Sequence, residues 1–225
     1  ELRRLSEDSN VRVLCLTGAG ASFSAGADLN WMRRAANFSE EENTADAHQL
    51  AAMLRTLDEF PCPTLALVNG AAFGGGIGLV AACDIAIAST QARFSLSEVR
   101  LGLVPATISP YVVAAIGQRA ARRFYLTGEK FDANTAHSID LVHEVVPHDE
   151  LKAAGEKMID TLLCGGPKAQ AVAKNLIKET APARDRDYLD AWTARLIAEI
   201  RQTDEAAEGL AAFFDKRPAA WQTQR

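Results

Sequence analysis

Residues 64–88 read TLALVNGAAFGGGIGLVAACDIAIA, and this stretch decides the fold. An apolar run at 64–68 is followed by a glycine triplet at 74–76, and the triplet leads into a second apolar run at 77–83. A run rich in isoleucine and alanine follows at 84–88. The order strand, glycine loop, helix, strand indicates an α/β chain built from a repeated strand–loop–helix unit.

The same pattern precedes this stretch. Residues 11–17 are rich in β-branched side chains and stop at Gly18, which predicts a largely buried strand. The loop after it continues to Asp28 and consists of small residues apart from Phe23, so a ligand can approach its backbone closely. Residues 29–60 have apolar positions at helical spacing, interrupted by a polar stretch, which predicts two helices.

The chain becomes mainly helical after Pro105. Helices are predicted at about 108–116, 118–126, 132–139, 150–163, 167–179 and 186–215, with one strand at 142–146. The last helix carries an apolar stripe that needs a partner, either the core of the chain or another subunit. The stripe consists of Leu189, Trp192, Leu196, Ile200, Leu210, Phe213 and Phe214.

Composition narrows the class of protein. The net charge is −5, apolar residues make up 48% of the 225 residues, and no cluster of basic residues is longer than Arg-Arg. We therefore expect a globular protein that binds no nucleic acid. No apolar run reaches the ~18 residues needed to cross a bilayer, and the first residues lack the apolar segment of a signal peptide. These features predict a cytoplasmic protein without a membrane association.

Cysteine and histidine spacing argues against metal sites. Cys15, Cys62, Cys83 and Cys164 stand far apart, and three of them lie in apolar runs, so buried free thiols are expected. The four histidines are dispersed without the spacing of metal ligands. We expect no metal.

Two small-residue loops and one glutamate carry the chemical argument. Residues 24–28 and the triplet 74–76 each follow a strand and run into a helix, so their amides can point at one carbonyl oxygen and form an oxyanion hole. The triplet alone could be a tight turn, and it lacks the lysine and Ser/Thr of a phosphate loop. Glu98 is a candidate acid or base, although a lone glutamate is more often a solvated surface charge.

Several motifs, in order and spacing, resemble the enoyl-CoA hydratase/isomerase family, the crotonases. They are SAGADL at 24–29, AAFGGGIG at 71–78, ACDIAIA at 82–88, EVRLGLVP at 98–105, LTG at 126–128 and EGLAAFFDKR at 208–217. The resemblance implies an α/β fold, a spiral of ββα units with a C-terminal helical region. It divides the chain into a core at 1–125, lacking some N-terminal strands of the family, and a helical oligomerisation region at 126–225. Such proteins assemble as trimers or hexamers.

The resemblance also assigns the site. It places the oxyanion-hole amides on Ala27 and Gly75 and the catalytic carboxylate on Glu98. Further contacts with the acyl-CoA substrate fall on Ala25, Gly26, Asp28, Leu29, Gly74 and Gly78. Lys216 or Arg217 could reach a CoA phosphate. No cofactor is implied, because CoA is part of the substrate.

One departure from the family pattern leaves the reaction open. Hydratases of this family use two glutamates 20 positions apart, and the earlier position is Gly78 in this chain. Glu98 alone could add water across the double bond of a 2,3-unsaturated acyl-CoA, or it could move that double bond as an isomerase does. Closer likeness to methylglutaconyl-CoA, isohexenylglutaconyl-CoA and carboxygeranoyl-CoA hydratases favours hydration of a branched or carboxylated acyl group. A non-catalytic member that binds acyl-CoA or RNA is the remaining alternative.

Overall fold

The computed structural model describes residues 1–181 and 185–222. They form two compact units. The first joins Glu1–Phe60 to Thr64–Lys157, and the second joins Pro61–Pro63 to the chain from Met158 onward. This boundary differs from the expected division at residue 125, because two strands beyond that residue pair with strands of the core.

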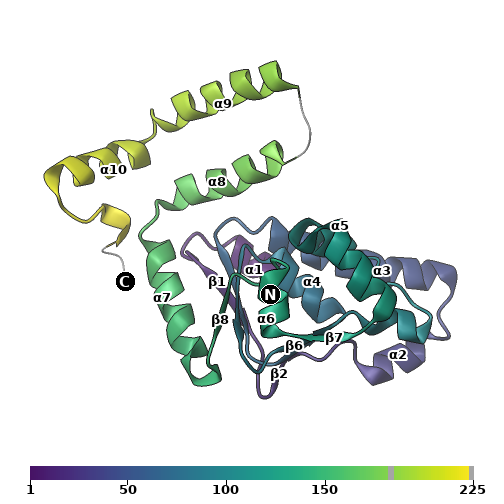
Figure 1. The fold of residues 1–225 in the computed structure, drawn as a ribbon. Coiled ribbons are helices and arrows are strands. Elements are labelled where there is room, and N and C mark those ends of the chain that lie inside the picture. Colours follow the sequence, from purple (N-terminus) through teal and green to yellow (C-terminus); the bar gives the residue numbers. More distant parts are fainter. Residues whose placement is uncertain (182–184, 223–225) are drawn as a thin grey trace. The chain divides into compact units, whose positions relative to one another are not determined.

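Eight strands of the first unit form two four-stranded sheets (Figure 1). The first sheet is parallel, and its order is β1 (Leu14–Thr17), β3 (Thr64–Val68), β5 (Ile85–Ser89) and β8 (Glu144–Val146). The second sheet has the order β2 (Ser22–Ser24), β4 (Ala71–Phe73), β6 (Arg93–Ser95) and β7 (Lys130–Asp132). Only β7 is antiparallel to its neighbour.

Strands β1 to β6 alternate between the two sheets. The chain passes from β1 to β2, from β3 to β4 and from β5 to β6, and helices follow each pair. This arrangement is the predicted spiral of ββα units. The four strands of the second sheet were not predicted, because each has three residues and is too short for a periodic pattern to show.

Helices surround the sheets of the first unit. They are α1 (Leu2–Ser6), α2 (Leu29–Ala35), α3 (Glu40–Asp58), α4 (Gly75–Ala82), η1 (Ser97–Leu101), α5 (Ser109–Thr127), α6 (Ala133–Ser138), η2 (His148–Glu150) and α7 (Leu151–Leu163), whose last turns lie in the second unit. The core lies between β3, β5 and helices α3, α4 and α5. Its largest fully buried side chains include Leu54, Leu57, Ile77, Phe94 and Phe124.

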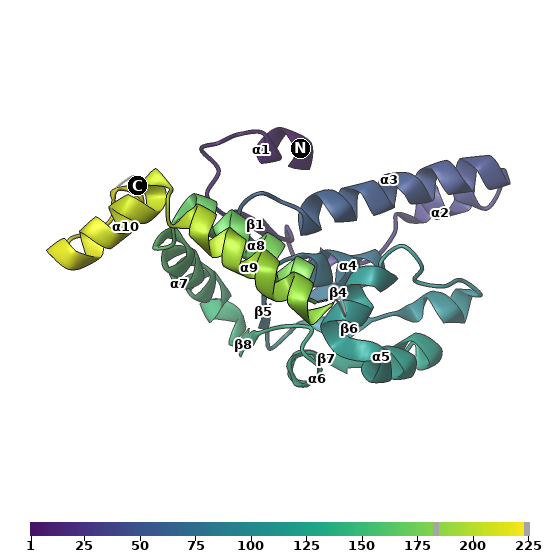
Figure 2. The same cartoon turned by 90° about the horizontal axis from the view of Figure 1, so that it is seen from above.

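The second unit contains α8 (Pro167–Thr180), α9 (Arg186–Ile200), α10 (Asp204–Asp215) and η3 (Ala220–Gln222). Helices α8 and α9 lie side by side in both views (Figure 1 and Figure 2). The prediction of one helix over 186–215 was wrong, because α9 ends at Ile200 and α10 begins after Thr203. Thr203 is the N-cap of α10, and its hydroxyl accepts a hydrogen bond from Ala206 N.

Two further expectations, on strand β1 and on the cysteines, need correction. Strand β1 begins at Leu14, and its side chains alternate between half-buried and exposed, so it is not largely buried. The thiols of Cys62 and Cys83 are buried as predicted, but Cys15 and Cys164 are exposed. An edge strand has a partner on one side alone, which an apolar run in the sequence does not reveal.

Asn69 follows β3, and its side chain binds the turn between β1 and β2. Its Oδ1 accepts a hydrogen bond from Gly18 N (3.1 Å), and its Nδ2 donates to Gly20 O (2.9 Å). We expect Asn69→Ala to lower the free energy of unfolding by about 1–2 kcal/mol, measured by urea titration, because two backbone groups lose their partner. The matched control Asn30→Ala, at an exposed position of α2, should leave the midpoint unchanged. Equal midpoints for both variants would contradict this role of Asn69.

Candidate active site

The two predicted oxyanion loops lie next to each other. Strands β2 and β4 are parallel neighbours, with Ser24 opposite Ala72, so the loops that follow them leave from the same edge of the sheet. Gly76, in the first turn of α4, touches the end of β2. A β-carbon added there would lie 2.8 Å from Ser24 O. Loop 24–28 and the glycine triplet are therefore brought together by strand pairing and by a contact that requires glycine.

The N–H of Gly75 lies at the start of helix α4, where the first-turn amides have no hydrogen-bond partner within the helix. Gly75 is the first residue of α4, and the N-cap, Gly74, has no side chain to satisfy the first-turn amides. A β-carbon added to Gly75 would meet nothing within 4 Å, so open space lies beside this residue. Across from it, loop residues 25–29, including Ala27, are exposed. The positive end of the helix dipole adds a field that favours negative charge here.

Gly74 brings the carboxyl of Glu98 against the loop. It has φ of +51° and ψ of −119°, a conformation that side chains rarely adopt, and its N–H donates to Ser95 O (2.9 Å). A β-carbon added to Gly74 would lie 3.1 Å from Glu98 Oε1. Both the conformation and the close approach require glycine at this position.

Glu98 is not a solvated surface charge. It lies in η1, directly after β6, and its backbone oxygen accepts a hydrogen bond from Leu103 N (3.0 Å). The side chain is half-buried, and Oε2 is buried without a hydrogen-bond partner. A buried carboxyl oxygen without a partner is costly, and it can accept a hydrogen bond from a bound molecule. The carboxyl of Glu98 thus lies beside the glycine loop, and its role as a base stays a prediction.

The environment of Glu98 predicts a pH dependence. Burial raises the pKa of the carboxyl above its ordinary value of 4.5, and a hydrogen bond from its own backbone opposes the shift. The carboxylate accepts a proton only when it is ionised, so kcat/KM should rise with pH through this raised pKa, with a slope of one proton. A pH profile of kcat/KM checks this. A profile that stays flat down to pH 4.5 would contradict it.

Gly78 has a packing role in the structure. It is buried in α4, and a β-carbon added to it would collide with Ile108 Cγ2 and approach Leu54 Cδ2 to 3.6 Å. The apolar side chain of Ile108 thus fills the place toward which a glutamate at position 78 would project. Contact of Gly78 itself with the substrate stays a prediction.

Other polar residues have structural roles. Asp28 is the N-cap of α2 and accepts a hydrogen bond from Trp31 N (2.7 Å). Asp84 accepts hydrogen bonds from the backbone N–H and the hydroxyl of Thr64 (2.7 and 2.9 Å). Both arrangements agree with the capping and strand-end roles that such residues usually have. Asp28 can still contribute its backbone to a CoA site.

Arg217 is occupied differently from the expectation. Arg217 forms a two-pronged ion pair with Glu208 (2.7 and 2.9 Å) and also lies 3.6 Å from Asp215. The Arg217 guanidinium lowers the pKa of Glu208 to about 2. This ion pair closes the turn after α10, so contact of Arg217 with a CoA phosphate has no support here.

Among residues 1–181 and 185–222, no group of three or more His, Cys, Asp or Glu side chains could hold a metal ion. Within the same residues, no helix has the length and apolar character that a membrane span requires.

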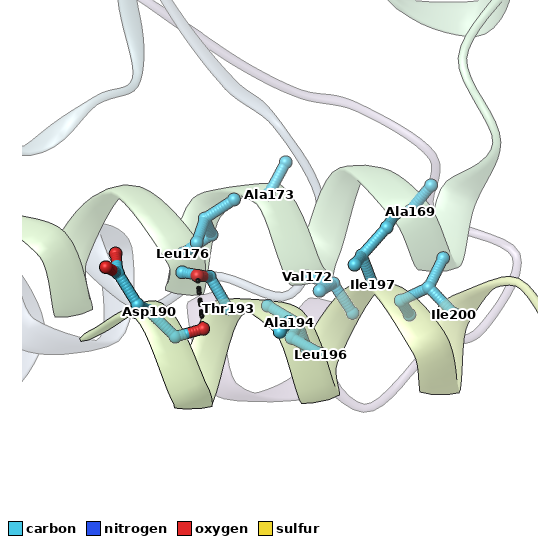
Figure 3. A pocket seen from close by; sticks show the side chains of 10 residues that line it. All are labelled: Ala169, Val172, Ala173, Leu176, Asp190, Thr193, Ala194, Leu196, Ile197 and Ile200. Carbon is cyan, nitrogen blue, oxygen red and sulfur yellow. Dashed lines mark hydrogen bonds between the residues drawn. The ribbon is translucent and has the colours of Figure 1, made fainter. Parts of the chain in front are cut away.

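An apolar groove lies in the second unit, between α8 and α9 (Figure 3). It has a volume of about 650 Å³. It is lined by Ala169, Val172, Ala173, Leu176, Asp190, Thr193, Ala194, Leu196, Ile197 and Ile200. Asp190 is the one ionisable residue in this lining, so the groove offers no acid–base pair and is not the candidate active site.

Sequence reasoning missed a pair of hydroxyls next to η1. Ser109 Oγ and Tyr125 OH lie 3.1 Å apart at the two ends of α5, which packs against η1. The two residues are 16 positions apart, so no motif joins them. The signal that could have found them is Gly117, where the helix breaks.

Comparisons with known proteins agree with this geometry. The sequence pattern of the Enoyl-CoA hydratase/isomerase family matches residues 1–224. A crystal structure of an enoyl-CoA hydratase from Shewanella pealeana is similar with a TM-score of 0.94 and 47% identity, covering 98% of this chain and 82% of that one.

Two curated bacterial relatives are similar over most of their length. A short-chain-enoyl-CoA hydratase of Clostridium acetobutylicum is 31% identical, over 95% of this chain and 81% of the relative. A 2,3-dehydroadipyl-CoA hydratase of Escherichia coli is 30% identical, over 96% and 83%. The matched family pattern, the two interleaved sheets and the carboxylate beside a glycine-rich helix start lead to one conclusion: the chain belongs to the enoyl-CoA hydratase/isomerase family and has its crotonase fold.

Proposed function

We propose that the protein hydrates 2,3-unsaturated acyl-CoA thioesters. The observation that carries this proposal is the carboxyl of Glu98, which lies against Gly74 with one buried oxygen unpaired. The open space beside the Gly75 amide adjoins this loop. The names of the similar proteins, an enoyl-CoA hydratase among them, support the same reaction.

In the proposed mechanism, the thioester oxygen accepts hydrogen bonds from the N–H groups of Ala27 and Gly75. Glu98 takes a proton from water as the water oxygen bonds to the β-carbon, and the electron pair of the double bond moves toward the thioester to give an enolate. Two fixed amides stabilise the enolate without reorganising. Glu98 then returns the proton to the α-carbon, which completes the hydration. The two reactants of this scheme are the CoA thioester and one water molecule.

The binding of CoA is assigned to the exposed loop Ala25, Gly26, Asp28 and Leu29, with Gly74 and Gly78 on the acyl side. Leu29 is 69% exposed, which is unusual for a leucine and suits a surface that a ligand covers. Gly26 has φ of +103°, so its backbone can turn toward a ligand in a way that other residues rarely allow.

The acyl group is proposed to be branched or carboxylated. The sequence resemblance to methylglutaconyl-CoA-type hydratases supports this, and a similar protein named for a dehydroadipyl thioester shows that such an acyl group occurs in relatives. Another relative is named for short chains. Isomerisation is the second candidate, because the single carboxylate and the Ile108 side chain against Gly78 leave no second acid at that place.

A panel of thioesters tests these alternatives. Crotonyl-CoA, 3-methylglutaconyl-CoA and a 3-enoyl-CoA would each be incubated with the protein. Ultraviolet absorbance would follow the loss of the conjugated double bond from the first two and its appearance from the third, and mass spectrometry would identify the products. The proposal expects each product of a 2-enoyl ester to be heavier by one water. The rate should be highest for the carboxylated ester. A product of unchanged mass would identify an isomerase, and binding without turnover would identify a non-catalytic member.

We also propose that the protein assembles as a trimer or hexamer. Phe213 and Phe214 of α10 are 76% and 73% exposed, and so much apolar surface suits an interface between subunits. Sedimentation velocity would give the number of subunits.

A further inference from the structure

Two hydroxyls of α5, the helix that packs against η1, form a short hydrogen-bonded chain that the mechanism above does not use. Ser109 Oγ donates a hydrogen bond to Pro105 O (2.6 Å) and lies 3.1 Å from Tyr125 OH. A serine hydroxyl can donate one hydrogen bond, and here it donates that bond to the Pro105 carbonyl. Tyr125 must therefore donate to Ser109, which leaves the lone pairs of the phenol oxygen free to accept a hydrogen bond from a water molecule.

The break in α5 creates this pair. Over 16 residues a straight helix would rise about 24 Å, too far for one tyrosine and one serine side chain to bridge. Gly117, with φ of 68° and ψ of 162°, interrupts the helical conformation, so the second half of α5 turns back toward its start. A glycine is needed at this position because other residues rarely adopt the conformation.

The pair lies in the surroundings of Glu98. Helix η1, which carries Glu98, packs against α5, and the loop from Leu103 to Ile108 leads directly into Ser109. Burial raises the pKa of Tyr125, and the negative charge of Glu98 raises it further, whereas the hydrogen bond between Tyr125 and Ser109 lowers it. The phenol belongs to the helix that packs against η1, which carries the carboxyl with an unpaired oxygen.

The neighbouring residue explains why a second polar group is needed. Ile108 fills the place in front of Gly78, so no acid can act from α4. The next residue along the chain is Ser109, whose hydroxyl orients Tyr125. The polar function that position 78 lacks can thus be supplied by Tyr125 of α5. Tyr125 is oriented by Ser109, which directly follows Ile108 in the chain.

We propose that Tyr125 binds the attacking water together with Glu98, and that Ser109 is a positioning residue that fixes the phenol of Tyr125. The proposal rests on the hydration proposed above. Glu98 takes one proton from the water, and the Tyr125 oxygen accepts a hydrogen bond from the other water hydrogen. The water oxygen thus keeps a lone pair directed to the β-carbon. Tyr125 neither gains nor loses a proton in this step.

Two reactions of the same protein separate this role from a structural one. Hydration needs the water, whereas exchange of the α-hydrogens of butyryl-CoA with D₂O needs the oxyanion hole and Glu98 alone. We expect Tyr125→Phe and Ser109→Ala each to lower kcat for hydration about tenfold, the loss for one hydrogen bond, with exchange changed less than about twofold. The double variant should be no slower than Tyr125→Phe, because the two hydroxyls act as a unit. Ser109→Thr should restore the rate because it keeps the hydroxyl.

The control is Tyr188→Phe, which removes the hydroxyl of a tyrosine on α9 in the second unit. This variant should change neither reaction. Unchanged hydration in Tyr125→Phe would overturn the inference alone and leave the proposed function intact. Equal losses of hydration and exchange would also overturn it, because they indicate a general disturbance of the site. A wild-type protein that hydrates no thioester of the panel would overturn both the inference and the proposed function.

Discussion

Replacing Glu98 with glutamine is expected to lower kcat for hydration by about 10²–10⁴-fold, the usual contribution of a general acid–base group. Glutamine has the same shape but cannot take a proton from water. The dissociation constant of a saturated acyl-CoA should stay nearly unchanged, because the oxyanion amides and the CoA loop are intact. Steady-state kinetics and isothermal titration calorimetry measure the two quantities.

The same substitution should not destabilise the fold. Because burial raises the pKa of Glu98, the folded state prefers the neutral side chain, and its stabilising contribution is lost as the pH rises through that raised pKa. A neutral glutamine should thus unfold at an equal or higher urea concentration at pH 7. The control Glu156→Gln, at an exposed position of α7, should leave turnover unchanged. Full activity in Glu98→Gln would remove Glu98 from the mechanism.

Replacing Gly75 with proline should lower kcat by about 10²–10³-fold, the usual loss for one oxyanion donor. The substitution removes the N–H that is proposed to hold the enolate oxygen. Gly75 is the first residue of α4, a position where helices accept proline, and the space beside it is open. The chain should therefore fold, which circular dichroism and sedimentation would verify.

Gly75→Ala is the matched variant because it adds a β-carbon and keeps the N–H. Its β-carbon meets no protein atom within 4 Å, so any effect comes from the ligand, and we expect a higher KM with kcat changed much less than in the proline variant. Equal losses of kcat in both variants would show that bulk, rather than the missing donor, slows the enzyme.

The sequence predicted the parts of the fold that long periodic patterns encode. Helix α3, strand β3 and the interruption of α5 at Gly117 agree with the structure, because each depends on local residues. The second sheet was missed. Its three-residue strands depend on pairing with partners far along the chain, such as Ala72 with Phe94, and no local pattern records that pairing.

The candidate site shows a similar division. Small residues in two strand-following loops predicted a backbone site, and the structure brings Ser24 and Gly76 into contact there. The sequence could not reveal that Gly78 faces Ile108, because helix packing depends on three-dimensional arrangement. The hydroxyl pair of Ser109 and Tyr125 was missed for the same reason.

A crystal structure of the Glu98→Gln protein with a bound enoyl-CoA tests the central claim most directly. The proposal expects the thioester oxygen about 2.7–3.1 Å from the nitrogens of both Ala27 and Gly75. The side chain of residue 98 should then face the double bond. A thioester oxygen bound away from these two amides, or a double bond distant from residue 98, would contradict the mechanism.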